Sequence, residues 1–214
     1  MLTNCKDALR LYAVTDRSWL GGNTLAAQVE LALRGGVTLV QLREKELELD
    51  QFVSEAVEIK ALCDRYGVPL IINDSVEVAL RCDAQGVHVG QSDMEAARAR
   101  ELLGPDKWIG VSARTLEEAR RAEEQGADYL GVGAVYSTST KLDARAVSHD
   151  TLHTICEAVS IPVVAIGGIS ADNLLTLRGS GIAGVAVVSA IFAQPDIEAA
   201  TRTLRRLADE AVGA

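Results

Sequence analysis

The chain has 214 residues, and its 21 Lys and Arg against 30 Asp and Glu give a formal net charge of −9. This length supports one sizeable hydrophobic core, and a hydrophobic content of 48% excludes a disordered chain. Only 4% of the residues are aromatic, so Ala, Val, Leu and Ile must build the core, as in parallel sheets covered by helices. The acidic balance disfavours binding to nucleic acid or to an anionic membrane, but it allows a small anionic substrate.

The first six residues lack the apolar core of a signal peptide, and no apolar run approaches the ~20 residues that span a bilayer. We therefore expect a cytoplasmic protein. The cysteines Cys5, Cys63, Cys82 and Cys156 form no Cys-x-x-Cys pair. Their spacing argues against a zinc site or a redox motif and favours buried free thiols.

Eight short apolar runs alternate with eight stretches of helical periodicity. The predicted strands begin near Leu11, Thr38, Leu70, Gly86, Trp108, Tyr129, Val163 and Val185. The predicted helices cover residues 24–35, 50–66, 75–81, 94–103, 115–125, 148–159, 171–178 and 196–212. Thr115 and Glu118 have the spacing of a capping box. Four glycines are placed to end helices in left-handed geometry, namely Gly35, Gly67, Gly126 and Gly181.

Eight strand–helix units in 214 residues average about 27 residues each, which suits right-handed parallel crossovers with few insertions. Eight such units can close a barrel, whereas a doubly wound open sheet usually has fewer strands. We therefore predict the α/β class and a single (β/α)8 TIM-barrel domain over residues 1–214. The active sites of such barrels lie at the C-terminal strand ends, so the polar residues there are the candidates for a functional site.

The second predicted strand ends in a cluster of charged residues. Gln41, Arg43 and Lys45 share one face, because side chains i, i+2 and i+4 of an extended segment point the same way. Two cations and an amide would then face one ligand. The alternative is an ordinary charged strand exit in which Glu44 and Glu46 neutralise the two cations.

Asp74 and Asp93 follow the third and fourth predicted strands and are candidate Mg²⁺ ligands. Carboxylates from adjacent strand ends can hold this ion while phosphate oxygens and water complete its coordination. The alternative is that each Asp caps the helix that follows it. His88, within the fourth strand, fits a hydrogen-bonded barrel histidine better than a catalyst.

Small residues end the last two predicted strands. Gly167 and Gly168 follow the seventh strand, and Val188 and Ser189 end the eighth. Backbone N–H groups and a helix N-terminus at these positions would form a phosphate site, as is common in the last units of such barrels. The alternative is that the glycine pair only allows a tight turn.

The longest loop runs from Tyr136 to Val147 and contains Thr138, Thr140 and Lys141. Hydroxyl groups beside a lysine suit a loop that grips phosphate, and long loops without secondary structure are often functional. The alternative is a solvated loop that only connects two units.

In this order, the segments resemble the thiamine-phosphate synthase (thiamine-phosphate pyrophosphorylase) family. The resemblance covers nearly the whole chain and is carried by residues 11–16, 41–45, 72–74, 86–91, 110–112, 138–141, 165–169 and 187–191. It implies that the protein condenses hydroxymethylpyrimidine diphosphate with a thiazole phosphate, with Mg²⁺ as cofactor, and releases pyrophosphate. The resemblance leaves open whether the enzyme is a homodimer and whether the thiazole carries a carboxylate.

The resemblance also implies roles for residues that match the family's motifs. The pyrimidine diphosphate would be bound by Gln41, Arg43, Lys45, Asn73, Ser112 and Lys141. Four of these would also be catalytic, namely Arg43, Lys45, Ser112 and Lys141. Asp74 and Asp93 would hold Mg²⁺. The thiazole phosphate would be held by Thr138, Ser139, Thr140, Gly168, Val188 and Ser189.

This chemistry needs electrostatics and positioning rather than a general base, because a thiazole nitrogen attacks with its own lone pair. Two other functions remain as alternatives. Thiazole tautomerases, the sister family, carry a histidine just after the serine of the fifth strand, where this chain has Ala113 and Arg114. A non-catalytic barrel that binds a phosphate ligand would gain little from two metal carboxylates.

Overall fold

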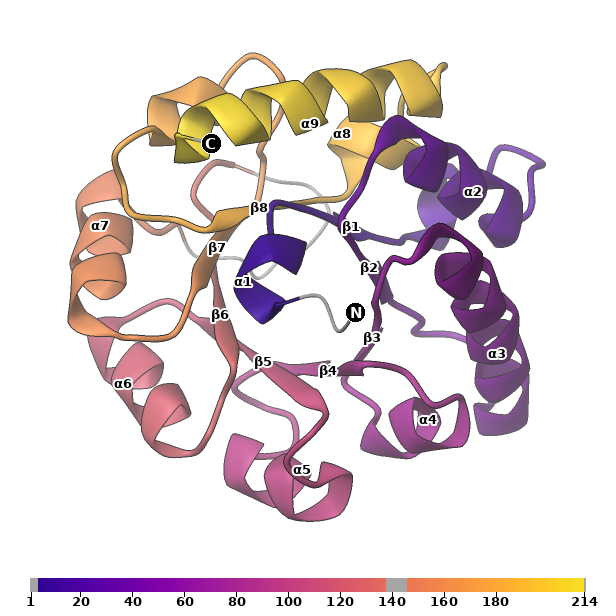
Figure 1. The fold of residues 1–214 in the computed structure, drawn as a ribbon, viewed down its shortest axis with the longest axis horizontal. Coiled ribbons are helices and arrows are strands. Elements are labelled where there is room, and N and C mark those ends of the chain that lie inside the picture. The colour runs from indigo at the N-terminus through magenta and orange to yellow at the C-terminus, as the bar shows by residue number, and fades with distance from the viewer. Residues whose placement is uncertain (1–3, 138–145, 214) are drawn as a thin grey trace.

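The computed structural model describes residues 4–137 and 146–213. Eight parallel strands form a closed barrel in the order of the sequence, and helices surround it (Figure 1). The predicted α/β class and TIM barrel are therefore confirmed. The strands are β1 (Leu11–Val14), β2 (Leu39–Leu42), β3 (Leu70–Asn73), β4 (Gly86–Val89), β5 (Trp108–Ala113), β6 (Tyr129–Gly133), β7 (Val163–Ile166) and β8 (Gly184–Val187).

The helices alternate with the strands, as the periodicity predicts. They are α1 (Cys5–Ala8), α2 (Leu25–Gly35), α3 (Leu49–Tyr66), α4 (Val76–Arg81), α5 (Ala96–Leu103), α6 (Leu116–Glu124), α7 (His149–Ala158), α8 (Ser189–Phe192) and α9 (Ile197–Val212). Two 3₁₀ helices, η1 (Arg17–Trp19) and η2 (Leu174–Leu177), complete the described elements. In this part of the chain, no helix has the length and apolar character that a membrane span requires.

Three local predictions are wrong. Gly181 ends no helix, because η2 ends at Leu177 with Arg178 as its cap, three residues before this glycine. The helix predicted over 171–178 is only the 3₁₀ helix η2, because the Asn173 side chain bonds the backbone of Ser170 and Gly168 and holds the preceding residues in a turn. The left-handed residue that caps α2 is Gly36, with a φ of 98°, rather than Gly35, which is the last residue of the helix. Gly35 serves packing instead, since a Cβ there would overlap Thr201 of α9.

Other helix ends follow the prediction. Gly67 and Gly126 follow α3 and α6 with φ values of 66° and 86°. Thr115 accepts a hydrogen bond from the Glu118 N–H at 3.2 Å, as a capping box requires. The Glu118 carboxylate, however, accepts from the N–H of Arg114 at 2.6 Å. The cap therefore fixes the backbone of Arg114 just beyond β5.

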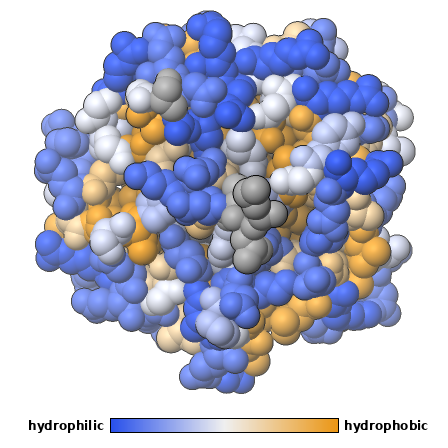
Figure 2. Space-filling view, in the orientation of Figure 1, coloured by the Kyte–Doolittle hydropathy of each residue, from blue (hydrophilic) through white to orange (hydrophobic). Residues whose placement is uncertain are grey.

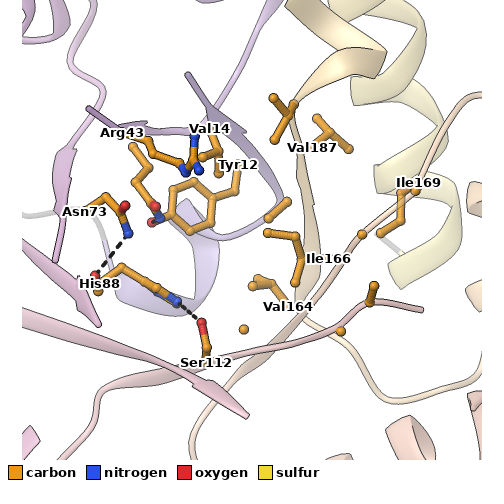
Figure 3. Close-up of a pocket in the computed structure, with 18 of the residues that line it drawn as sticks. Tyr12, Val14, Arg43, Asn73, His88, Ser112, Val164, Ile166, Ile169 and Val187 are labelled. Atoms are coloured by element: carbon orange, nitrogen blue, oxygen red, sulfur yellow. Dashed lines mark hydrogen bonds between the residues drawn. The ribbon is translucent and has the colours of Figure 1, made fainter. Parts of the chain in front are cut away.

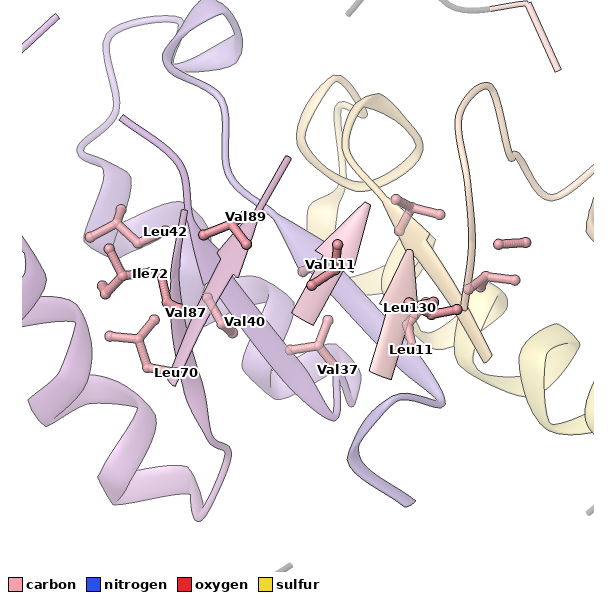
Figure 4. Packing of buried hydrophobic residues seen from close by; sticks show 14 of the residues in the cluster. Leu11, Val37, Val40, Leu42, Leu70, Ile72, Val87, Val89, Val111 and Leu130 are labelled. Carbon is pink, nitrogen blue, oxygen red and sulfur yellow. The ribbon is translucent and has the colours of Figure 1, made fainter. Parts of the chain in front are cut away.

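Alternation along the strands separates two regions of hydrophobic core. Outward side chains such as Val40, Ile72 and Leu130 pack under the helices (Figure 4). Inward side chains such as Tyr12, Ile71 and Tyr129 fill the barrel, and α1 covers the N-terminal end of the strands (Figure 1). Figure 2 shows that hydrophilic residues cover most of this face. Because all strands are parallel, their C-terminal ends and the polar residues that follow them lie at the opposite end of the barrel from α1.

Candidate active site

A pocket lies at the C-terminal ends of the strands (Figure 3). Its lining includes seven residues predicted for the site, namely Gln41, Arg43, Asn73, Ser112, Gly168, Val188 and Ser189. They come from β2, β3, β5 and the segments after β2, β7 and β8, which lie far apart in the sequence. Closure of the barrel brings them together. Thr138, Ser139, Thr140 and Lys141 lie outside the described residues, so their predicted roles stay predictions.

The two cations after β2 each contact a carboxylate at a neighbouring strand end. A guanidinium nitrogen of Arg43 lies 3.1 Å from Asp16, which follows β1, and Lys45 Nζ lies 2.5 Å from Asp74, which follows β3. The Lys45 side chain is half-exposed. The interpretation in which Glu44 and Glu46 neutralise these cations is wrong. Glu44 alternates to the other side of the segment and binds Arg17, and Glu46 forms no ion pair within the described residues.

Glu44 forms a buried clamp with Arg17 and Glu55. Its carboxylate accepts hydrogen bonds from the N–H groups of Lys45 at 2.8 Å and Glu46 at 3.0 Å, and from Arg17 Nε. Arg17 also bonds Glu55 of α3 at 2.5 Å. Burial acts to raise the pKa of Glu44, but these hydrogen bonds outweigh burial and lower it. Burial raises the pKa of Glu55 against the attraction of Arg17. The clamp holds the backbone that carries Lys45.

Asp74 and Asp93 form a pair of carboxylates beside the pocket. Asp74 has a left-handed φ of 62° and accepts a hydrogen bond from Asn73 Nδ2 at 2.9 Å. Burial raises the pKa of Asp74, Lys45 opposes this shift, and the negative charge of Asp93 adds to it. Asp74 does not cap α4, because the cap is Ser75. Asp93 accepts from the Gly90 N–H at 2.7 Å instead of capping α5.

This pair fits Mg²⁺. Hard carboxylate oxygens are its preferred protein ligands, and one or two of them suffice when substrate phosphates supply the rest. Burial is the main cause of the raised pKa of Asp74 and the negative charge of Asp93 adds to it, so a divalent cation between the two carboxylates would stabilise both charges. Within residues 4–137 and 146–213, no group of three or more His, Cys, Asp or Glu side chains could hold a metal. The two-carboxylate set is therefore the candidate.

The other end of the pocket is formed by backbone. Gly167 and Gly168 have φ values of 100° and 66°, and a Cβ on Gly168 would overlap the carbonyl of Ser137. The N–H groups of Gly168 and Ser189 make no hydrogen bond within the described part of the chain, although both residues line the pocket. Unused N–H groups at a wall where only glycine fits support the phosphate-site interpretation.

Arg114 lines the pocket but was not predicted as a site residue. It lies two residues beyond Ser112, so strand alternation places both on one face, and that spacing was the available signal. Its guanidinium forms no ion pair within the described residues. His88 is the hydrogen-bonded barrel histidine that was predicted, since it is buried and bonds Tyr129. It also bonds Ser112 (Figure 3).

No cysteine offers a reactive thiolate. All four thiols are free, and none lines the pocket. Burial raises the pKa of Cys5 and Cys63 to about 12 and that of Cys156 to about 11, and it raises the pKa of Cys82 as well. The site therefore has cations and N–H donors but no cysteine nucleophile.

Comparison with known proteins identifies the family. A family described as thiamine monophosphate synthase matches residues 11–191. The chain belongs to this family. It is 53% identical over 194 residues to a thiamine-phosphate synthase from Ruminiclostridium cellulolyticum, which covers 91% of this chain and 92% of the relative. It is 49% identical over 200 residues to a thiamine-phosphate synthase from Clostridium botulinum, with 94% of each chain covered.

A solved member of the thiamine monophosphate synthase family has the same fold. The thiamine phosphate pyrophosphorylase from Pyrococcus furiosus superposes with a TM-score of 0.91 and 39% sequence identity. The match covers 98% of this chain and 100% of that one. The agreement therefore extends over the barrel and all of its strand ends.

Proposed function

We propose that this protein is a thiamine-phosphate synthase. It joins hydroxymethylpyrimidine diphosphate to a thiazole phosphate and releases pyrophosphate. The observation that carries this conclusion is the identity of about half of all residues with proteins named thiamine-phosphate synthase, over more than nine-tenths of the chain. The pocket suits two phosphorylated substrates, because it has cations at one end and unused N–H groups at the other.

In this proposal the pyrimidine diphosphate lies over β2 to β5. Gln41 and Asn73 bind the aminopyrimidine, while Arg43, Lys45 and Ser112 bind the diphosphate together with Lys141. Arg43 and Lys45 would exchange Asp16 and Asp74 for phosphate oxygens, because both cations lie at the rim and Lys45 is half-exposed. These preorganised charges stabilise the leaving group as the C–O bond breaks.

Asp74 and Asp93 would hold Mg²⁺ next to the diphosphate. When bound, the ion supplies positive charge that neutralises phosphate oxygens. The side chain of Asn73 bonds Asp74 at 2.9 Å and so holds this carboxylate next to the pyrimidine site. Lys45 Nζ lies 2.5 Å from the same carboxylate, so the residues proposed for the pyrimidine, the diphosphate and the metal adjoin one another.

The thiazole phosphate would be held at the glycine end by Gly168, Val188 and Ser189, with Thr138, Ser139 and Thr140 contributed by the loop after β6. There the thiazole nitrogen faces the methylene carbon of the pyrimidine. The C–O bond to the diphosphate breaks, the electron pair leaves with pyrophosphate, and the nitrogen lone pair forms the new C–N bond. No proton needs to be removed from the nucleophile, which agrees with a site without a cysteine base.

The test is a turnover experiment with both purified substrates and Mg²⁺. We expect thiamine phosphate and pyrophosphate in equal amounts, and only when both substrates are present. Isomerisation of a thiazole phosphate without added pyrimidine diphosphate would instead indicate a tautomerase. Binding of a phosphate ligand without any turnover would indicate a non-catalytic barrel.

We further propose that residues 1–214 act as one barrel domain and that the enzyme works in the cytoplasm. Four free thiols without a disulfide suit a reducing compartment. Fractionation of cells together with limited proteolysis of the purified chain would test both points.

A further inference from the structure

A continuous row of buried hydrogen bonds crosses the barrel beneath the pocket. Gln41 Nε2 lies 2.5 Å from Tyr12 Oη, and this hydroxyl lies 2.9 Å from the hydroxyl of Tyr129. Tyr129 Oη lies 3.2 Å from His88 Nδ1, and His88 Nε2 lies 3.0 Å from Ser112 Oγ. Gln41 and Ser112 at the two ends line the pocket, and so do Tyr12 and His88, whereas Tyr129 does not; the three middle residues are buried. The row joins two residues proposed to bind opposite ends of one substrate.

The chemistry of the donors gives this row a direction. The Gln41 amide N–H can only donate, so Tyr12 accepts this hydrogen bond and uses its own hydroxyl proton to donate a hydrogen bond to Tyr129. Tyr129 then donates to His88 Nδ1. The remaining ring nitrogen, Nε2, carries the proton of a neutral imidazole and donates to Ser112. The Ser112 hydroxyl proton then points into the pocket as a donor. The Gln41 amide oxygen points into the pocket as an acceptor.

The phenols can keep this direction because each holds its single proton. Burial raises the pKa of Tyr12, and burial together with the neighbouring Tyr12 raises that of Tyr129. Both hydroxyls therefore stay neutral, each with one proton to donate and lone pairs to accept. The reverse direction needs a turned Gln41 amide and a proton on His88 Nδ1, and it would make Ser112 donate away from the pocket.

The strands leave space for this row at two glycines. A Cβ on Gly110 of β5 would overlap both the Tyr129 ring and His88 Nδ1. A Cβ on Gly131 of β6 would come within 3.1 Å of His88 Cε1. Inward positions of β5 and β6 thus lack side chains where the histidine and the tyrosine meet. The two glycines therefore leave space for the polar row, which packs against backbone atoms at these positions.

We propose that Tyr12, Tyr129 and His88 are positioning residues that hold Ser112 as a hydrogen-bond donor and Gln41 as an acceptor. This inference rests on the proposed function. Ser112 would donate to an anionic diphosphate oxygen, and Gln41 would accept from the exocyclic amine of the pyrimidine. The two ends of one substrate are thereby recognised through a single directed row, which rejects a ligand with the opposite arrangement of donors and acceptors.

The direct test is the tautomer of His88, measured on the full chain without substrate. Long-range ¹H–¹⁵N spectra of the labelled protein near neutral pH distinguish a proton on Nε2 from one on Nδ1. The chain has three histidines, so His149→Gln and His153→Gln assign the signals of His88 by elimination. We expect a neutral ring protonated at Nε2. A proton on Nδ1 overturns the proposal, whatever the enzyme turns over.

A kinetic test uses Tyr129→Phe, which removes only the central hydroxyl. We expect kcat/KM for the pyrimidine diphosphate to fall about tenfold, the effect of losing one buried hydrogen bond, while KM for the thiazole phosphate is unchanged. In this background Ser112→Ala should cost less than about twofold more, because the two residues act through one row. If the effects of the two substitutions are fully additive, the proposal is overturned.

Tyr66→Phe is the matched control, because Tyr66 bonds Glu30 and Arg34 on the exterior of the barrel. It should leave both kinetic constants unchanged. Should Tyr129→Phe fail to fold, Tyr12→Phe removes the preceding link and carries the same expectation. The histidine spectrum of this variant adds a readout that general destabilisation does not move, since the preference for Nε2 should weaken. An unchanged preference overturns the proposal.

Discussion

The clamp of Arg17, Glu44 and Glu55 leads to a prediction about stability that also concerns the active site. Arg17→Met keeps the length of the side-chain stem and removes the guanidinium that bridges Glu44 and Glu55. Two buried carboxylates would then face each other without a cation. The backbone of Lys45 would lose part of its support, because Glu44 also accepts its N–H. We therefore expect lower stability together with a higher KM for the pyrimidine diphosphate.

The magnitude follows from burial. Removing one partner of a fully buried ion pair costs about 3–5 kcal/mol. The Glu44 side chain is 2% exposed, but that of Glu55 is 16% and that of Arg17 is 33%, so water weakens the second contact. We expect the free energy of unfolding to fall by about 2 kcal/mol at neutral pH, which is the buried-pair value discounted for this exposure.

The loss should depend on pH with a definite sign. The pKa of Glu44 is lowered in the folded protein, so its contribution is present above the pKa of the unfolded carboxyl and is lost as pH falls. In Arg17→Met the folded pKa values of both carboxyls rise. Protonation of the two groups in the variant therefore begins above about pH 4.5, the usual range of Glu, and the difference from the parent protein should shrink as pH falls through this range.

Urea unfolding at neutral pH and near pH 4 measures this difference. Arg98→Met is the control, because it breaks an exposed pair with Glu101 whose side chains are 61% and 65% exposed. That variant should change stability by less than about 0.5 kcal/mol. Arg17→Lys should recover only part of the loss, since an ammonium lacks the planar fork that binds two carboxylates. Equal losses of unfolding free energy in Arg17→Met at both pH values, or no loss at neutral pH, would show that Arg17 does not stabilise the two carboxylates in this way.

Three further predictions concern the site. Arg43→Ala, and likewise Lys141→Ala, should lower kcat by about a hundredfold or more, the cost of one preorganised charge contact; near-normal steady-state rates would contradict the assignment. Asp93→Asn should abolish Mg²⁺-dependent turnover, and full activity of the parent enzyme in a chelator would exclude the metal. Gly168→Ala should raise KM for the thiazole phosphate at least about tenfold by the overlap with Ser137, with KM for the pyrimidine diphosphate unchanged.

Most of the site could be predicted from sequence because its residues stand at strand ends. Gln41 and Arg43 flank the apolar Leu42, and Asn73 follows an apolar run, so their strand and the end at which they lie follow from the local pattern. Sequence alone could not distinguish a metal-binding role of Asp74 from a helix-capping role, because Asp suits both roles. The structure decides it, since Ser75 makes the cap and leaves Asp74 beside Lys45.

The eight units, the barrel, the end of the barrel that carries the site and the family all follow from the sequence. They depend on periodicity and on the order of short segments along one chain. Tertiary structure alone decided which side chains meet. Tyr12 and Tyr129 are 117 residues apart yet share a hydrogen bond, and Arg43 finds Asp16 across adjacent strands. Such pairs depend on how side chains from different strands pack against one another in the closed barrel, and no local pattern of the sequence specifies these contacts.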